Sequence, residues 1–286
     1  MECLCCGREN VNFYKKLNGY INYRCSNCGL IFVWPKQGVG STDAIYAEDY
    51  FRGASRGFGF ADYEVDKKVT RKTFDFFLGE LAKIMPEKGS ILDIGCATGY
   101  FMELAENEGW HASGIDISEY AVKKGREKQL NTFRGTLSDN LFKPGTFNAI
   151  SLFDVLEHLP EPLEAISKAK HLLKNRGIVI VNTPDSSSLV SKVFGRRWHL
   201  INPPEHLYLF NKNNLSRFFN ENGFKILKIG KIGKTFTLKY VLRFLANRRI
   251  PPFGLFNRMV KNEFLGKLPI PINLRDNFFI IAQKND

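Results

Sequence analysis

Four cysteines have the residue spacing best suited to metal chemistry in this sequence. Cys3 and Cys6, and later Cys25 and Cys28, form two C-x-x-C-Gly pairs. Four thiolates arranged in this way are ligands for tetrahedral Zn²⁺, and so short a segment needs a metal or another clamp to fold. Disulfides are the competing interpretation, which the lack of a recognisable signal peptide disfavours. The sequence therefore predicts structural zinc, with Cys5 as a spare sulfur.

A glycine-rich turn follows a short apolar run at residues 91–94, which indicates a buried parallel strand. Gly95 and Gly99 open the turn, and a helical pattern continues after them. A strand that leads into a helix through glycine is where doubly wound folds bind ligands. A dinucleotide would need G-x-G-x-x-G, but Ala97 and Tyr100 occupy the second and third glycine positions. The turn therefore predicts a different ligand.

Two acids narrow the choice of ligand. Asp93, just before the turn, would repel a phosphate and attract an ammonium group. Asp116 ends the next predicted strand, at the position where a carboxylate can accept hydrogen bonds from both ribose hydroxyls. Together the acids predict a nucleoside with a cationic amino-acid tail and no phosphates, and S-adenosylmethionine fits this description.

Residues 91–101, 114–117 and 153–159 resemble, in order and spacing, the motifs of class I S-adenosylmethionine-dependent methyltransferases, in particular the quinone-biosynthesis O-methyltransferases. The resemblance implies an α/β fold with a doubly wound, Rossmann-like sheet of seven strands. The sequence departs from the family pattern at Ala97, where many relatives have glycine. The resemblance also implies a set of cofactor-binding residues: Arg71, Asp93, Gly95, Ala97, Gly99, Asp116, Ile117, Leu137 and Phe153.

Three parts of the chain are expected to position these residues: a zinc ribbon (1–40), a connector with an N-terminal helix (41–89) and the methyltransferase domain (90–286). The connector is rich in glycine and aromatic residues, which fits either a mobile lid or a buried packing loop. A helical insertion, about 231–275, precedes the last strand. Its basic amphipathic pattern fits an anionic membrane surface or a roof over the acceptor pocket.

Two of the five histidines follow predicted strands near the cleft. His158 comes directly after the fourth strand, and His206 comes after the fifth strand and a short helix. Histidine suits the removal of a proton from a hydroxyl acceptor, so both are candidate catalytic bases. His158 could instead cap and orient the helix that follows it.

The net charge of +12 fits RNA, an anionic membrane or an acidic substrate equally well. No apolar run approaches the roughly 20 residues of a membrane span, so we expect a cytoplasmic protein, with peripheral membrane contact left open. The main prediction is O-methylation of a small molecule, a lipid-linked glycan or a quinone-like acceptor. Two alternatives stay open: an RNA methyltransferase that uses the ribbon and the positive charge, and a non-catalytic zinc-ribbon adaptor that still binds cofactor.

Overall fold

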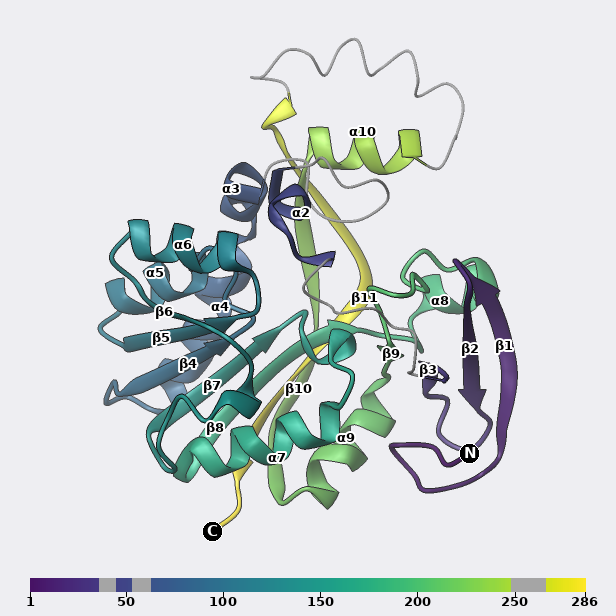
Figure 1. Ribbon diagram of the computed structural model, residues 1–286, viewed down its shortest axis with the longest axis horizontal. Coiled ribbons are helices and arrows are strands. Elements are labelled where there is room, and N and C mark those ends of the chain that lie inside the picture. The colour runs from purple at the N-terminus through teal and green to yellow at the C-terminus, as the bar shows by residue number, and fades with distance from the viewer. Residues whose placement is uncertain (36–44, 53–62, 248–265) are drawn as a thin grey trace.

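The computed structural model describes residues 1–35, 45–52, 63–247 and 266–286 (Figure 1). It contains a seven-stranded sheet in the order β10-β11-β8-β7-β4-β5-β6. Neighbours from β8 to β6 are parallel, whereas β11 and β10 are antiparallel additions at one edge. This sheet confirms the predicted doubly wound fold. Its strands are β4 (Ser90–Ile94), β5 (His111–Asp116), β6 (Asn131–Arg134), β7 (Phe147–Phe153), β8 (Leu173–Pro184), β10 (Phe224–Thr237) and β11 (Pro269–Lys284).

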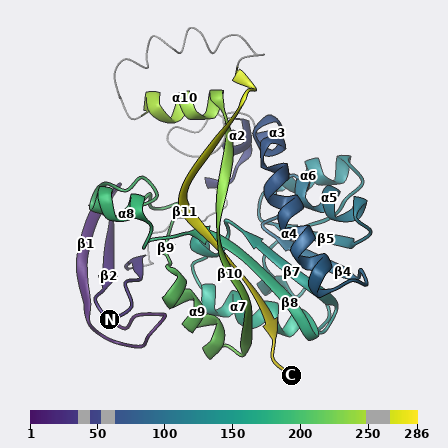
Figure 2. The same cartoon turned by 180° about the vertical axis from the view of Figure 1, so that it is seen from behind.

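Helices cover both faces of the sheet because successive strand residues point to opposite sides. In β4, Ile91 packs with α4 and α5, whereas Leu92 and Ile94 pack with α7 and α9 on the other face. Figure 2 shows the sheet from behind, with α4 in front of it. The longer helices are α4 (Arg71–Ile84), α5 (Tyr100–Asn107), α6 (Glu119–Glu127), α7 (Pro162–Leu172), α9 (Lys212–Glu221) and α10 (Leu238–Asn247).

Short helices place the loops at the carboxyl edge of the sheet. They are α2 (Glu48–Arg52), α3 (Tyr63–Asp66), η1 (Lys67–Thr70), η2 (Leu137–Asp139), η3 (Leu156–His158), α8 (Leu189–Phe194) and η4 (Gly195–Arg197). Among the described residues, no helix is both long and apolar enough to cross a membrane.

The N-terminal ribbon forms a second sheet, and the main domain completes it. Strands β1 (Val11–Leu17), β2 (Tyr20–Cys25) and β3 (Ile31–Val33) are joined by β9 (Tyr208–Leu209), which belongs to the later chain. The side chains of Asn211 and Asn214 also donate hydrogen bonds to the Cys28 carbonyl, at 2.9 and 3.4 Å. The ribbon is therefore packed onto the main domain (Figure 1).

Strands β10 and β11 are longer than the sequence predicts, since they pair as far as Thr237 and Pro269. The helical insertion between them is correspondingly shorter. Phe236, near the end of β10, and Tyr240 and Val241 of α10 line the large cavity described below. The start of the insertion therefore forms part of the cavity wall, and its role as a roof over the acceptor stays a prediction. Residues 248–265 of the predicted insertion lie outside the described residues, and residues 269–275 belong to β11 instead of the insertion.

Candidate functional site

A cavity of about 1600 Å³ lies along the carboxyl edge of the parallel strands. A pocket for one small ligand usually has about 300–1,000 Å³, so this cavity has room for two molecules. Three predicted cofactor residues, Arg71, Asp93 and Gly99, lie outside its lining. The other predicted cofactor residues and both candidate bases are in the lining: Gly95, Ala97, Asp116, Ile117, Leu137, Phe153, His158 and His206.

The backbone conformation explains the composition of the turn after β4. Gly95 has φ +70°, and a Cβ added there would lie 2.4 Å from Val155 Cγ2. Ala97 also has a positive φ, 48°, a region that costs an L-residue about 1–2 kcal/mol. Its N–H donates a hydrogen bond to Asp116 Oδ2 at 2.8 Å, which stabilises the turn. Glycine is the least strained residue at both positions, and the small alanine is accommodated at the second.

The two predicted acids occupy different environments. Asp116 lines the cavity, and its carboxylate accepts hydrogen bonds from the N–H groups of Ala97 and Ser118, both at 2.8 Å. Asp93 is buried outside the lining and accepts a hydrogen bond from Ser151 Oγ at 2.7 Å. Burial raises the pKa of Asp93 to about 7. Asp116 therefore faces the cavity, while Asp93 is buried and bonded to Ser151 of the neighbouring strand β7.

Phe153 lies at the carboxyl end of β7, as predicted, and forms part of the cavity wall. Its ring packs between those of Phe77 and Phe101, each with a centroid separation of 4.8 Å. This aromatic cluster fixes the position of Phe153 and provides an apolar surface near the middle of the cavity.

The structure places Arg71 away from the predicted cofactor site. Its side chain is 65% exposed, and its Nε lies 3.4 Å from Asp75 Oδ2 on the outer side of α4. Lys67 lines the cavity instead and is only 4% exposed. Residues four apart share a face in a continuous α-helix, but the 3₁₀ segment η1 between these two changes their relative direction. The cation at this end of the cavity is therefore Lys67.

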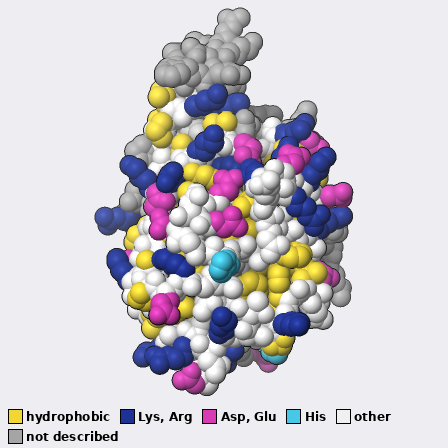
Figure 3. Space-filling view, turned by 90° about the vertical axis from the view of Figure 1, so that its left-hand side faces the viewer, with side chains coloured by type: hydrophobic (Ala, Val, Ile, Leu, Met, Phe, Trp, Pro, Cys, Tyr) yellow, Lys and Arg dark blue, Asp and Glu magenta, His cyan; other side chains and the backbone are white. Residues whose placement is uncertain are grey.

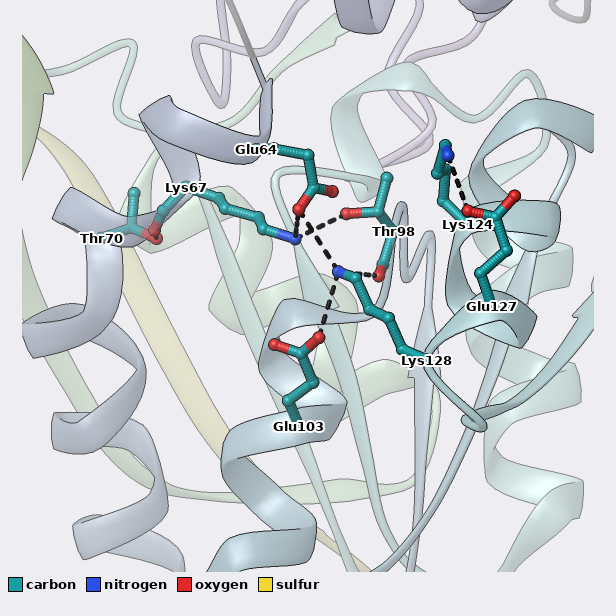
Figure 4. A network of polar contacts seen from close by, with 8 residues as sticks. All are labelled: Glu64, Lys67, Thr70, Thr98, Glu103, Lys124, Glu127 and Lys128. Carbon is teal, nitrogen blue, oxygen red and sulfur yellow. Dashed lines mark hydrogen bonds and ion pairs between the residues drawn. The ribbon is translucent and has the colours of Figure 1, made fainter. Parts of the chain in front are cut away.

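Lys67 belongs to a network of charges beside the turn after β4 (Figure 4). Its Nζ lies 2.6 Å from Glu64 Oε2 and donates a hydrogen bond to Thr98 Oγ1 at 2.9 Å. Lys128 joins the network, 3.4 Å from Glu64 and 3.0 Å from Glu103. Burial lowers the pKa of Lys67 to about 8, and Glu64 opposes this effect. The Lys67 ammonium is thus mostly protonated at neutral pH.

His158 and His206 come from distant segments and lie together, with ring centroids 4.9 Å apart. The Nδ1 atom of His158 lies 2.6 Å from the Glu205 carbonyl oxygen, and Nδ1 of His206 lies 2.6 Å from the Leu200 carbonyl oxygen. A carbonyl oxygen can only accept, so each Nδ1 carries the hydrogen. In the neutral rings Nε2 is then the basic nitrogen, which is the state a general base requires.

The described part of the connector packs over this pair of histidines. The rings of Tyr46 and His158 meet edge to face, with centroids 6.0 Å apart. The Tyr50 hydroxyl donates a hydrogen bond to Glu205 Oε1 at 3.3 Å, and Asn202 Nδ2 donates to Oε2 at 2.9 Å. The Glu205 side chain thereby ties the connector to the loop that carries the second histidine. The glycine-rich part of the connector lies outside the described residues.

The four cysteines predicted to bind zinc converge. Sγ of Cys3 lies 3.4 Å from that of Cys28, Sγ of Cys6 lies 3.6 Å from that of Cys25, and all four sulfurs are within 4.8 Å of one another. Tetrahedral zinc would place its sulfur ligands about 3.8 Å apart. A disulfide would need a separation of about 2.05 Å. The donor set therefore fits zinc, and the buried Cys5 is outside the set.

A second group of metal-type ligands includes the histidine pair. Glu157, His158 and His206 each place one ligand atom within 4.8 Å of the others. Glu157 is fully buried and accepts a hydrogen bond from Thr183 Oγ1 at 2.9 Å. A carboxylate beside two imidazoles can stabilise a proton on either ring, and the same atoms are suitable ligands for a divalent cation.

Sequence reasoning missed several residues of this site. Lys67 could have been found as the residue one helical turn before Arg71, but spacing alone does not separate the two. Glu205 directly precedes a predicted base, yet nothing local indicates that it contacts Tyr50. The ribbon residues that line the cavity carry no sequence signal for this position: Lys15, Leu17, Asn18 and Tyr20.

Comparisons with known sequences agree with this geometry. The model of a family described as "Methyltransferase domain" matches residues 64–229, more than half of the chain. The ubiquinone biosynthesis O-methyltransferase of Xylella fastidiosa (strain 9a5c) is 31% identical over 114 residues, which cover 37% of this chain and 46% of that enzyme. The enzyme of the same name from Pseudomonas aeruginosa (strain UCBPP-PA14) is 27% identical over 159 residues, 51% and 68% of the two chains. The match to the Xylella enzyme thus spans less than half of its length.

Solved structures show the same fold. The YcgJ protein from Bacillus subtilis aligns with a TM-score of 0.53 at 15% identity, covering 74% of this chain and 99% of that one. The BH2331 methyltransferase structure from Bacillus halodurans C-125 aligns with a TM-score of 0.53 at 18% identity, covering 73% and 99%. At such identities the likeness concerns the fold, whereas the family match rests on sequence. The chain therefore belongs to the methyltransferase-domain family, and its seven-stranded sheet has the Rossmann-like fold of such domains.

Proposed function

We propose that this enzyme transfers a methyl group to a hydroxyl oxygen of a small molecule, which includes quinone-like and sugar or lipid-linked glycan acceptors. The pair of histidines carries the proposal. Both line the cavity and both are held through Nδ1, so that Nε2 is the basic nitrogen of each neutral ring. The relatives named for ubiquinone O-methylation support an oxygen acceptor.

The residues at the other end of the cavity fit the cofactor. Asp116 offers a carboxylate to the ribose hydroxyls, and Phe153 offers an apolar surface in the middle. Lys67 places a buried cation where it can bind the carboxylate of the amino-acid portion. When bound, S-adenosylmethionine supplies an electrophilic methyl group. The chain itself positions the two reactants and excludes water.

The histidine end performs the proton transfer. Nε2 of His158 or His206 accepts the proton of the acceptor hydroxyl, and the nearby Glu157 carboxylate stabilises the resulting imidazolium. The Glu205 carbonyl holds His158 in the correct tautomer. A positioned base of this kind contributes about 10²–10⁴-fold to the rate.

In this proposal the ribbon binds zinc through Cys3, Cys6, Cys25 and Cys28 and has a structural role, since all four ligand positions are filled by protein. An RNA-binding surface would gather cations on one face. On the face shown in Figure 3, lysine and arginine side chains are interspersed with acidic ones. This face therefore lacks the one-sign patch that RNA binding would require, and the labelling experiment below distinguishes the two acceptor classes.

The test is transfer of label from S-adenosylmethionine into a fractionated cell extract. We expect label in the small-molecule or lipid fraction, and a loss of about 10²-fold or more in His158→Gln or His206→Gln. His171→Gln is the matched control, because His171 is exposed on α7 outside the cavity. Calorimetry with S-adenosylhomocysteine should show unchanged cofactor binding in all three variants.

Three outcomes would overturn the proposal. Label that enters RNA would identify the RNA methyltransferase. Full activity in both histidine variants would remove the proposed bases. Cofactor binding without any transfer by the wild-type chain would favour the non-catalytic adaptor.

A further inference from the structure

The cavity continues beyond the histidines as far as the zinc ribbon. Four residues of the β1–β2 hairpin are part of its lining: Lys15, Leu17, Asn18 and Tyr20. Asn18 Nδ2 also donates a hydrogen bond to the Pro203 carbonyl at 2.9 Å, in the loop that leads to His206. The hairpin is thereby fixed as an end wall of the cavity.

The elements at this end carry charge of one sign. Strands β1 and β2, helix α8 and segment η4 together contain six cations and no acid along their described lengths: Lys15, Lys16, Arg24, Lys192, Arg196 and Arg197. These elements are neighbours, because the Arg196 guanidinium lies over the Tyr14 ring of β1, 5.7 Å from its centroid. Figure 1 likewise shows α8 beside the upper ends of β1 and β2.

The acids of the cavity lie mostly on other elements. Asp116 and Glu157 belong to the cofactor and histidine regions, and Glu164 forms an ion pair with Lys168 at 2.6 Å. On the ribbon side, Asp276 of β11 lies 4.0 Å from His199. Glu205, in the loop that Asn18 contacts, also lines the cavity and accepts hydrogen bonds from Tyr50 and Asn202. The hairpin, α8 and η4 thus add cations to a lining whose acids come from other elements.

Only two of the six cations, Lys15 and Arg197, are among the residues that line the cavity. Arg24 and Arg196 lie over the Tyr14 ring instead. Arginine binds phosphate oxygens through a planar fork of donors, and lysine adds a point charge. In a partly enclosed site such contacts are screened less by salt than on an open surface.

We propose that the ribbon end of the cavity binds a phosphate or pyrophosphate group of the acceptor through Lys15 and Arg197. The inference rests on the proposed function and narrows the acceptor to a phosphorylated molecule, such as a nucleotide-linked or lipid-linked hydroxyl compound. Phe194, exposed beside Arg197 in the same lining, offers an apolar surface to the part of the acceptor beyond the phosphate. The zinc ribbon thus acts as part of the substrate site.

The experiment measures binding to the zinc-loaded, full-length protein saturated with S-adenosylhomocysteine. The soluble probes are inorganic pyrophosphate and uridine diphosphate, and the lipid probe is a vesicle of phosphatidylglycerol and phosphatidylcholine. The test variant is Lys15→Ala with Arg197→Ala. The control, Lys16→Ala with Lys192→Ala, removes the same charge from two exposed residues of β1 and α8 outside the lining. Zinc content and thermal unfolding confirm that both variants are folded.

We expect the test variant to bind a phosphate probe at least about tenfold more weakly, as lost charge-assisted hydrogen bonds predict, and the control to change by less than about twofold. A loss with the soluble probes identifies a free phosphorylated acceptor, and a loss with the vesicles alone identifies a lipid-linked one. Equal weakening in both variants, or no binding to any probe, overturns the inference. If S-adenosylhomocysteine fails to bind the wild-type protein, the proposed function itself fails.

Discussion

The two ends of the cavity are built in different ways. The cofactor end comes largely from one continuous stretch, in which β4, β5, β6 and β7 each deliver a turn to the same edge of the sheet. The acceptor end is assembled from the ribbon hairpin, the connector, η3, the loop before β9 and the start of the insertion. The cofactor end is therefore built from segments that follow one another in the chain, whereas the acceptor end brings together segments that are far apart in it.

This difference indicates that the binding of the acceptor can be disturbed without disturbing the binding of the cofactor. Contacts such as Ala97 to Asp116 are set by the geometry of parallel strands and need no distant partner. The carbonyl groups that hold the two histidines, those of Glu205 and Leu200, both belong to the loop before β9, and the ribbon holds this loop through Asn18 and Pro203. Damage to the ribbon should accordingly disturb the acceptor end and spare the cofactor end.

Loss of the zinc site is the strongest test of that comparison. Cys25→Ser should remove the bound zinc and lower the free energy of unfolding by about 4 kcal/mol or more, since loss of a structural metal is among the largest single-residue effects. Methyl transfer should be lost, while S-adenosylhomocysteine should bind with nearly unchanged affinity. Metal analysis, denaturant unfolding and calorimetry provide the three readouts.

Cys5→Ala is the control for this variant. Cys5 is buried in the same core cluster but is outside the set of four converging sulfurs, so its replacement should keep the zinc and most of the stability. The separation of the two ends would be contradicted if Cys25→Ser lost cofactor binding together with methyl transfer in a protein whose main domain was still folded.

The same contrast explains what the sequence could predict. The doubly wound sheet, the glycine turn and Asp116 follow from local patterns, because strand, turn and helix signals lie close together in the chain. The four cysteines follow from ligand spacing. The role of the hairpin does not, because tertiary packing alone brings Lys15 and Arg197 into the lining of one cavity. Arg71 shows a further limit: a short 3₁₀ segment alters which of two cations faces the cavity, and helical periodicity does not detect it.

A smaller effect distinguishes Lys67 from Arg71 at the cofactor end. Lys67→Met should weaken S-adenosylhomocysteine binding by about 10–100-fold, the cost of one lost charge-assisted interaction, whereas Arg71→Ala should change it little. The pKa of Lys67 is lowered to about 8, and the charged form binds a carboxylate. Affinity should therefore be steady below pH 8 and fall as the pH rises above it.

Calorimetry at pH 7 and at a pH well above 8 would measure this dependence. Lys67→Arg supplies the control, since arginine stays protonated across this range and should remove the decline in affinity at high pH. If Arg71→Ala were the more damaging change, the cation that binds the cofactor would be the one the sequence predicts rather than the one that lines the cavity.

The smallest expected effect concerns the contact between the ribbon and the main domain. Asn211 caps α9 by accepting a hydrogen bond from the Asn214 N–H at 2.9 Å, and its Nδ2 donates to the Cys28 carbonyl. Asn211→Ser keeps a cap but removes that donor, so it should cost about 0.5–1.5 kcal/mol of unfolding free energy, and Asn211→Ala should cost about 1 kcal/mol more. Denaturant unfolding of the zinc-loaded protein would measure both. If the serine variant were as stable as the wild type, the ribbon would be held by β9 and its apolar contacts alone. In that case the acceptor end would depend on sheet pairing and packing and not on the carbonyl of a zinc ligand.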